Sequence, residues 1–198
     1  RLVGSEMCIR DRSGSGRDIY NFNPGWRYYK GDMERAETVE LDDSDWEVVA
    51  TPHSVELMPA EASGCRNYQG PVWYRKWFVI PAATRGKQVF IHFEAVMGKQ
   101  KVYLNGHLVK EHLGGYLPFN IDLTANGIQA GDSCLIAVMA DNSDDKSYPP
   151  GKRQYTLDFS YHGGIYRDVW MIAKSDVSIT DAVDAGKVAG GGVFIHYG

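Results

Sequence analysis

The chain has 198 residues, a formal net charge of −4 and 43% hydrophobic residues. This length suffices for one all-β domain with a substantial core, but not for a sandwich plus a barrel of about 250 residues. Because the charge is mild and no run of lysine and arginine occurs, nucleic acid and anionic membrane are poor candidates for partners. No apolar stretch approaches the roughly 20 residues of a membrane-spanning helix.

The first 16 residues differ in character from the rest. RLVGSEMCIRDR is followed by Ser-Gly-Ser-Gly and has neither the apolar core nor the cleavage site of a signal peptide. The run resembles a translated sequencing-adapter artefact, so we expect residues 1–16 to be disordered or to make few contacts. A true leader could have been lost with the natural start, and the sequence therefore leaves the compartment open.

The three cysteines give no framework. Cys8, Cys65 and Cys134 have neither metal-ligand spacing nor an even number for disulfide pairing. Cys134 lies in an apolar segment and is expected to be a buried, reduced thiol.

Short β-type segments, separated by turn residues, follow one another along the chain. Asn105-Gly106 is a strong hairpin signal, because a type I′ turn needs positive φ at both central residues. No stretch of helical period competes, so the pattern favours an all-β, antiparallel sandwich. The expected strands are residues 26–30, 37–41, 46–49, 73–80, 87–95, 101–104, 107–111, 117–123, 134–140 and 165–172.

Two long irregular loops interrupt these strands, residues 56–69 and 141–156. Loops of this length in a compact domain are usually functional or mobile. The DNSDD run at 141–145 suggests calcium, but the glycine and terminal glutamate of an EF-hand loop are missing, so a solvated acidic turn is favoured.

The stretch LDFSYHGGIYRDVWMI, residues 157–172, combines a strand with a polar end. Ile165, Val169 and Met171 are expected to face a core, and Tyr166, Trp170 and Ile172 the opposite side. Asp158 precedes the strand among Phe159, Tyr161 and His162. A carboxylate rimmed by aromatic rings suits a polyhydroxylated ligand, although composition alone favours a turn aspartate beside buried rings.

Five motifs in order carry a family resemblance. They are WYRKWF (73–78), VYLNG (102–106), HLGGYLPFNIDLT (112–124), AVMADNSD (137–144) and GGIYRDVW (163–170). Over about residues 20–175 the chain resembles the N-terminal domain of glycoside hydrolase family 2, which holds β-galactosidases, β-glucuronidases and β-mannosidases. The resemblance implies a jelly-roll β-sandwich like galactose-binding domains, followed by an immunoglobulin-like domain and a catalytic barrel.

The resemblance also implies a site. An aspartate before the G-I-x-R strand and an asparagine in the loop before the W-Y-R strand bind sugar hydroxyls in several members, and they match Asp158 and Asn67. The match at Asn67 is weaker because that loop varies in length. The family's catalytic glutamates lie on the barrel, so no catalytic residue, metal ligand or cofactor is assigned here, and a sodium ion as in some β-galactosidases has no support in this sequence.

Other polar residues are interpreted as structural. His53 has no carboxylate or nucleophile partner in sequence. Arg167 and Asp168 are expected on the strand as a buried or edge-spanning ion pair. Tyr116 and His112 flank Gly114-Gly115 and could line a groove, but a turn between strands explains them equally.

Three functions remain in view. The first is the N-terminal domain of a retaining β-glycosidase that contributes to a site on a barrel outside this sequence, inactive by itself. The second is a free-standing carbohydrate-binding module, and the third a structural or assembly domain. We expect the sandwich at residues 20–174, and a linker with the cut start of an immunoglobulin-like domain at 175–198. The sugar and the oligomeric state are not determined. The predicted core comprises Ile91, Phe93, Val102, Leu104, Val138, Val169 and Met171.

Overall fold

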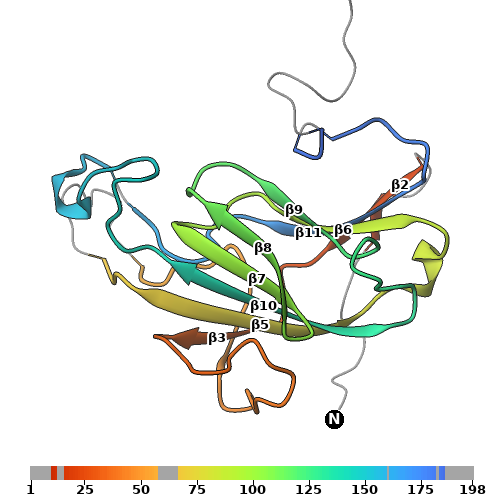
Figure 1. Cartoon of the computed structure of the whole chain (residues 1–198), viewed down its shortest axis with the longest axis horizontal. Coiled ribbons are helices and arrows are strands. Elements are labelled where there is room, and N and C mark those ends of the chain that lie inside the picture. The colour runs from red at the N-terminus through yellow and green to blue at the C-terminus, as the bar shows by residue number, and fades with distance from the viewer. Residues whose placement is uncertain (1–9, 13–15, 58–66, 160, 182, 186–198) are drawn as a thin grey trace, which may run out of the picture.

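The computed structural model describes residues 10–12, 16–57, 67–159, 161–181 and 183–185. Figure 1 shows two stacked layers of strands, with β9, β11, β6 and β2 above and β3, β5, β10 and β7 below. The described residues form no α-helix, only the short 3₁₀ turns Ala82–Thr84 and Gln154–Thr156. The predicted antiparallel sandwich is confirmed.

Each layer is an antiparallel sheet. The upper sheet has the order β1-β2-β11-β6-β9, and the lower sheet has the order β4-β3-β5-β10-β7-β8. The strands are β1 (Arg10–Arg12), β2 (Arg17–Asn21), β3 (Trp26–Lys30), β4 (Glu47–Val49), β5 (Pro71–Val79), β6 (Gln88–Phe93), β7 (Lys99–Leu104), β8 (His107–Leu113), β9 (Phe119–Asp122), β10 (Ser133–Asp141) and β11 (Val169–Lys174).

The core lies between the sheets, where alternate side chains of each strand meet. All seven predicted core residues are buried. Aromatic rings fill much of the space, since Phe22 packs edge-on against both Trp26 and Phe78 at centroid distances of 5.6 and 4.9 Å. Cys134 is buried as predicted, and this burial raises the pKa of its thiol to about 12.

The predicted hairpin between β7 and β8 is present. Asn105 and Gly106 have φ values of 49° and 85°, the left-handed conformation that a type I′ turn requires at both positions. The Asn105 side chain accepts a hydrogen bond from the backbone N–H of Leu135 at 2.9 Å, so the turn is also attached to β10.

The outer face of the lower sheet is covered by the loop of residues 31–46, seen at the bottom of Figure 1. Arg75 of β5 points into this loop with a fully buried side chain. Its guanidinium donates hydrogen bonds to the carbonyl groups of Ala36, Thr38 and Leu41, and its Nε lies 2.7 Å from a carboxylate oxygen of Asp43.

This cation explains why the predicted strand at residues 37–41 is absent. The carbonyl groups that would join a ladder turn toward Arg75 instead, and the segment forms turns. A buried guanidinium needs several acceptors, and an irregular loop can supply carbonyl groups from one side of the cation more readily than a strand can.

The last strand begins later than predicted. β11 starts at Val169, and the predicted start at Ile165 is wrong because the backbone of 163–165 is bonded elsewhere. Gly163 and Ile165 accept from the N–H groups of Val55 and His53, and Gly164 accepts from that of Met97. The predicted sidedness holds, since Ile165, Val169 and Met171 are buried in the core.

Both ends of the chain depart from expectation. Arg10–Arg12 pairs with β2, so the prediction of few contacts for residues 1–16 is wrong for this segment. The edge of β2 presents backbone N–H and C=O groups with which another strand can pair, and this pairing does not depend on the side chains of that strand. Residues 175–180 form no strand, and the residues after them are attached to the sheet by ion pairs.

These ion pairs join Arg17 to Asp181 at 3.5 Å and Lys174 to Asp184 at 3.1 Å. Residues 1–9 with Cys8, residue Cys65 and the end of the predicted linker lie outside the described residues. The artefactual origin of the first residues and the beginning of a further domain after Lys174 therefore stay predictions.

We predict that Arg75→Ala lowers the free energy of unfolding by about 3–5 kcal/mol, because it leaves Asp43 and three carbonyl groups without their buried partner. Urea denaturation followed by tryptophan fluorescence measures this loss. Arg85→Ala serves as the control, since Arg85 is exposed and the change should stay within about 0.5 kcal/mol. Equal stability of the two variants would show that the loop does not depend on Arg75.

Candidate functional site

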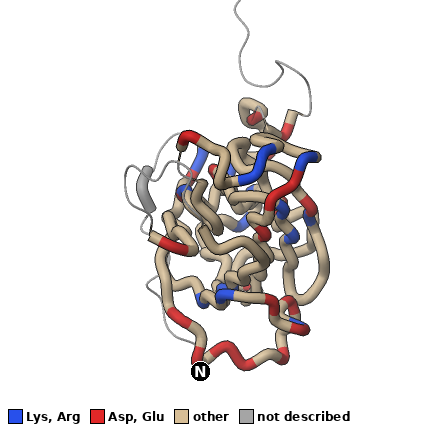
Figure 2. Tube along the Cα trace, turned by 90° about the vertical axis from the view of Figure 1, so that its left-hand side faces the viewer, with Lys and Arg blue, Asp and Glu red and all other residues tan. Residues whose placement is uncertain are grey.

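The segments that carry the two predicted site residues, Asn67 and Asp158, meet at one end of the sandwich. The connections after β10 and before β11 gather at the left of Figure 1, and Figure 2 turns this end toward the viewer. Asn67 lies directly before β5, and Asp158 lies in the long connection to β11. Their segments are in contact, because the side-chain nitrogen of Asn67 donates to the carbonyl of Tyr161 at 2.7 Å.

Asp158 occupies a bend and is exposed to solvent. No hydrogen bond or ion pair joins its carboxylate to any other residue that the structure describes. A structural turn aspartate would spend its oxygens on nearby backbone N–H groups, so those of Asp158 are available to hydroxyl groups of a ligand. Phe159 beside it exposes 45% of its surface, which provides the adjoining ring that the sequence suggested.

A small hydrophobic cluster supports this bend from below. Leu157 and Tyr161 are buried together with Met97, and Tyr166 packs against them. The Tyr166 hydroxyl donates to the carbonyl of Gly115, which connects the cluster to the turn after β8. Burial raises the pKa of the Tyr161 hydroxyl, so this group stays neutral. Packing on both sides thus fixes the backbone of Asp158, while its carboxylate has no hydrogen-bond partner among the described residues.

Asn67 is placed differently from Asp158. It exposes only 8% of its surface, and its amide nitrogen is committed to Tyr161. Its Oδ1 is buried without a partner among the described residues. Asn67 therefore holds the segment that carries Asp158 and does not present its amide group to solvent.

Asn142, which follows β10, joins the loops behind the site. Its Oδ1 accepts from the N–H of Gly70 at 3.2 Å, and its Nδ2 donates to the carbonyl of Tyr68 at 2.7 Å. Its own carbonyl accepts from the side chain of Gln154 at 2.8 Å. Gly163 packs directly on it, since a Cβ there would lie 2.6 Å from Nδ2 of Asn142.

The importance of Asn142 is not apparent from the sequence. The AVMADNSD motif contains Asn142, but the acidic residues around it suggest a calcium-binding loop. No local pattern indicates it, because the burial of Asn142 and its bonds to Gly70 and Tyr68 arise only where distant loops meet in the fold.

The acidic residues at the end of β10 and after it accept hydrogen bonds from backbone N–H groups of the following turns. Asp141 accepts from the N–H of Ser143, and Asp144 accepts from that of Gln154. Asp145 pairs with Lys99 at 2.6 Å, and this hydrogen bond with those of Ser147 holds the pKa of the Asp145 carboxyl well below its usual range. Within the described ranges, no group of three or more His, Cys, Asp and Glu residues is arranged to hold a metal ion.

His53 has the structural environment that its sequence context suggested. Its Nδ1 lies 2.9 Å from the hydroxyl of Tyr74, and its ring packs against Tyr28 at a centroid distance of 4.6 Å. Burial lowers the pKa of the imidazole, which favours the neutral form. Gly164 permits this contact, because it has a φ of 86° and a Cβ there would lie 2.1 Å from the Tyr74 hydroxyl.

The predicted ion pair between Arg167 and Asp168 is absent. Both residues precede β11, where Arg167 is exposed and lies over the ring of Tyr166. Asp168 accepts a hydrogen bond from the side chain of Asn23 at 2.8 Å, which secures the turn after β2. The prediction was wrong because the strand starts one residue later than this pair.

The residues around Gly114-Gly115 divide between turn and surface. His112 bonds Gln100 at 2.8 Å and stacks on Phe119, so it is part of the fold. Tyr116 exposes 42% of its surface near Tyr161. Glu94 accepts a hydrogen bond from the indole N–H of Trp170, and Glu111 lies 3.7 Å from Lys101.

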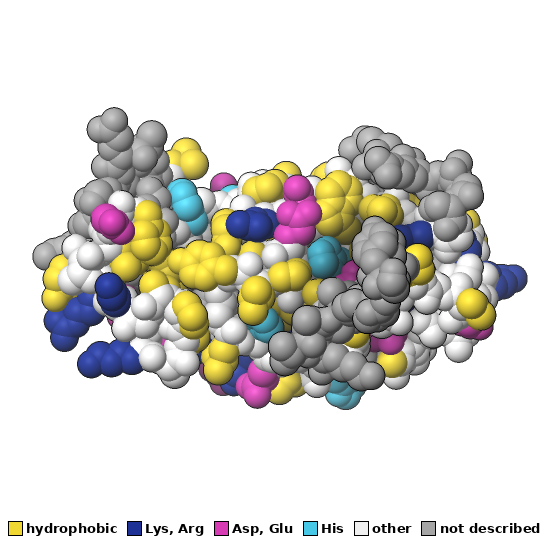
Figure 3. Space-filling model, turned by 90° about the horizontal axis from the view of Figure 1, so that it is seen from above, with side chains coloured by type: hydrophobic (Ala, Val, Ile, Leu, Met, Phe, Trp, Pro, Cys, Tyr) yellow, Lys and Arg dark blue, Asp and Glu magenta, His cyan; other side chains and the backbone are white. Residues whose placement is uncertain are grey.

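The upper face of the molecule carries mixed charges. Figure 3 shows hydrophobic side chains across the middle of the face above β9, β11 and β6, with single charged residues between them and no continuous basic area on that face. Among the described residues, no helix is long and apolar enough to cross a membrane.

Comparisons with known proteins agree with this architecture. The family model of the sugar-binding domain of glycosyl hydrolases family 2 matches residues 19–175. A β-galactosidase from Thermoanaerobacter pseudethanolicus is 40% identical over 166 residues, which are 84% of this chain and 22% of the relative. A β-glucuronidase from Formosa agariphila is 32% identical, over 85% of this chain and 18% of the relative.

Solved structures lead to the same family. Bacteroides uniformis β-glucuronidase 2 superposes with a TM-score of 0.70 at 30% identity, over 81% of this chain and 18% of that one. A putative β-galactosidase from Bacteroides fragilis superposes with a TM-score of 0.68 at 32% identity, over 86% and 25% of the two chains. The chain thus spans about a fifth of the length of the curated relatives it matches. The chain belongs to glycoside hydrolase family 2, in which it corresponds to the sugar-binding domain.

Proposed function

We propose that this domain lends Asp158 to the sugar-binding site of a retaining β-glycosidase of the β-galactosidase or β-glucuronidase kind. The catalytic carboxyl groups would lie on a barrel in the remainder of the longer protein. Family membership supports the general function, and the relatives of both names support the reaction class. The observation that carries the site is the exposed carboxylate of Asp158, which has no partner among the described residues.

The chemistry of Asp158 follows from its two free oxygens. A carboxylate accepts hydrogen bonds from neighbouring hydroxyl groups of a terminal β-linked sugar and fixes the orientation of the ring. Such bonds to a charged group contribute roughly 1.5–3 kcal/mol each. They orient the sugar for acid catalysis and nucleophilic attack by two carboxyl groups about 5–5.5 Å apart, as retaining enzymes require.

Asn67 belongs to the same site in a supporting role. Since its amide nitrogen is held by the carbonyl of Tyr161, we propose that it shapes the site by fixing the position of the segment that carries Asp158. This differs from the direct sugar contact that the family resemblance implied.

We predict that Asp158→Ala lowers kcat/KM at least tenfold in an enzyme assembled from this domain and the remaining four-fifths of the Thermoanaerobacter relative. The loss corresponds to one or two hydrogen bonds to the sugar. Hydrolysis of aryl β-galactosides and aryl β-glucuronides measures it. Stability should change little, because the side chain contacts no described residue.

The matched control is Asp176→Ala, which removes an exposed carboxylate after β11. If both variants of an active enzyme kept the parent's kcat/KM, Asp158 would have no part in sugar binding and the proposed function of this site would be wrong.

We also predict that Asn67→Ala and Asn67→Asp each lower the free energy of unfolding of this chain by about 1–3 kcal/mol, because both leave the Tyr161 carbonyl without its donor. Urea denaturation provides the measurement. Asn126→Ala is the control, since its exposed side chain bonds a carbonyl within a surface turn and should contribute much less. A loss at Asn67 no larger than at Asn126 would contradict the supporting role.

A further inference from the structure

Asn142 connects the loops around Asp158 to the middle of the lower sheet. It directly follows β10, which pairs with β5 on one side and with β7 on the other. The chain entering β7 comes very close here, because a Cβ at Gly98 would lie 1.9 Å from the carbonyl oxygen of Asp141 and 2.9 Å from Cα of Asn142. The backbone of Asn142 is therefore fixed by the sheet and does not have the freedom of a loop.

The side chain of Asn142 is buried and holds the segment before β5. Its Nδ2 donates to the carbonyl of Tyr68 at 2.7 Å, and its Oδ1 accepts from the N–H of Gly70 at 3.2 Å. Asn67, the neighbour of Tyr68, donates in turn to the carbonyl of Tyr161 at 2.7 Å. Asn142 thus fixes the chain that follows Asp158.

A second connection leads to the chain that precedes Asp158. The backbone carbonyl of Asn142 accepts from the side chain of Gln154 at 2.8 Å. The backbone carbonyl of Gln154 accepts from the N–H of Leu157 at 3.1 Å, and Leu157 is the residue directly before Asp158. The bend that carries Asp158 is therefore attached to Asn142 on both sides.

Gly163 adds a third attachment, by close packing. A Cβ at this position would lie 2.6 Å from Nδ2 of Asn142 and 3.0 Å from a methyl carbon of Val55. Gly163 does not have the left-handed φ of Gly164, which is 86°. A glycine is therefore required at 163 by the approach of Asn142 and not by the backbone conformation.

We propose that Asn142 is a positioning residue for the reaction and acts on the sugar through the carboxylate of Asp158. This inference rests on the proposed function of Asp158. Because that carboxylate bonds no described residue, its place depends on the backbone before and after it, which Asn142 holds at Gln154 and, through Asn67, at Tyr161. A misplacement of about 1 Å at a reacting site can cost on the order of a hundredfold in rate, so loss of these attachments should weaken catalysis.

The test is a double-mutant cycle in the enzyme assembled from this domain and the remainder of the Thermoanaerobacter relative. We expect Asn142→Ala to lower kcat/KM for aryl β-glycosides about tenfold when Asp158 is present, and less than about twofold in the Asp158→Ala background. A residue that only stabilises the fold would lower the urea midpoint in both backgrounds and leave the kcat/KM of the folded enzyme unchanged.

A second variant reaches the same amide group from the other side. Gly163→Ala introduces the close Cβ contact and should cause a smaller loss of kcat/KM, about threefold, that again depends on Asp158. If Asn142→Ala does not fold, this variant decides the question by the same comparison.

The matched control is Asn105→Gly, at the other end of β10. It removes the hydrogen bond to Leu135 while glycine retains the φ of 49°, so stability should fall and kcat/KM should not. The proposal is overturned if Asn142→Ala and Gly163→Ala keep the parent's kcat/KM, or if they lower it equally without the Asp158 carboxylate. If Asp158→Ala alone had no effect, the proposed function would be wrong and this inference would fall with it.

Discussion

Two adjacent cations in the middle of β5 determine how the sandwich is closed. Arg75 points outward and is buried by the loop of residues 31–46, while Lys76 points inward and is buried in the core. The ammonium group of Lys76 donates to the carbonyl groups of Phe22 and Pro24, both at 2.7 Å, and lies 3.9 Å from the centre of the Phe22 ring. A buried charge is tolerated only when it is well paired, so each cation fixes one loop on one face of the sheet.

The end of the sandwich that carries Asp158 is built by different means. Neutral amide groups of Asn67, Asn142 and Gln154 join the loops there. An amide can donate and accept at once, so it can connect two backbone segments without bringing in a charge. Since the network contains no lysine or arginine, it does not neutralise the carboxylate of Asp158. The buried charges that stabilise the fold, Arg75 and Lys76, are thus separate from the carboxylate that is proposed to bind sugar.

The sequence predicted the sandwich well because its strands have short-range signals. The apolar run of β10, the alternation of Val169, Trp170 and Met171 in β11 and the Asn105-Gly106 turn are local signals, and the structure has a strand or a turn at each of them. The segment at 37–41 also alternates, but its carbonyl groups bind Arg75, which lies more than thirty residues away along the chain. Such a long-range constraint leaves no mark in a local pattern.

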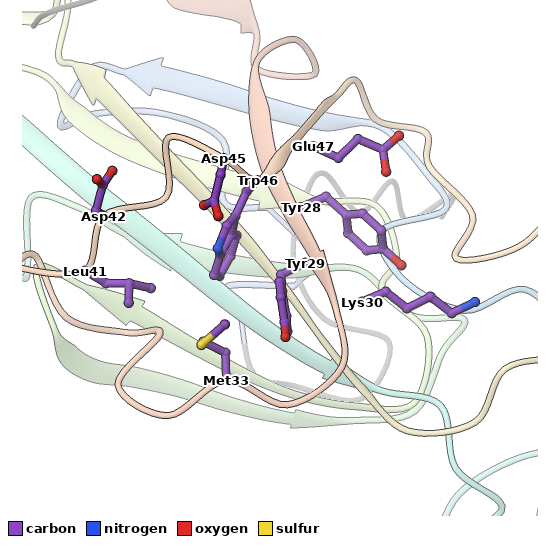
Figure 4. Close-up of a pocket in the computed structure, with 9 residues that line it drawn as sticks. All are labelled: Tyr28, Tyr29, Lys30, Met33, Leu41, Asp42, Asp45, Trp46 and Glu47. Carbon is purple, nitrogen blue, oxygen red and sulfur yellow. The ribbon is translucent and has the colours of Figure 1, made fainter.

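The candidate site was predictable only in part. Family spacing led to Asp158, and the structure leaves this carboxylate exposed. The burial of Asn67 and the role of Asn142 depend on loops that meet only in the folded molecule, so no spacing rule could indicate them. The packing of Trp46 against Tyr29, shown in Figure 4, was missed for the same reason, since it joins β3 to the loop that follows it.

The most direct test of the account is a crystal structure of the assembled enzyme with a bound, slowly hydrolysed glycoside. The account predicts an Asp158 oxygen within about 3 Å of a sugar hydroxyl, while the amide nitrogen of Asn67 remains on the carbonyl of Tyr161. A sugar seated in the catalytic site with Asp158 beyond hydrogen-bond reach, directly or through one water, would contradict it.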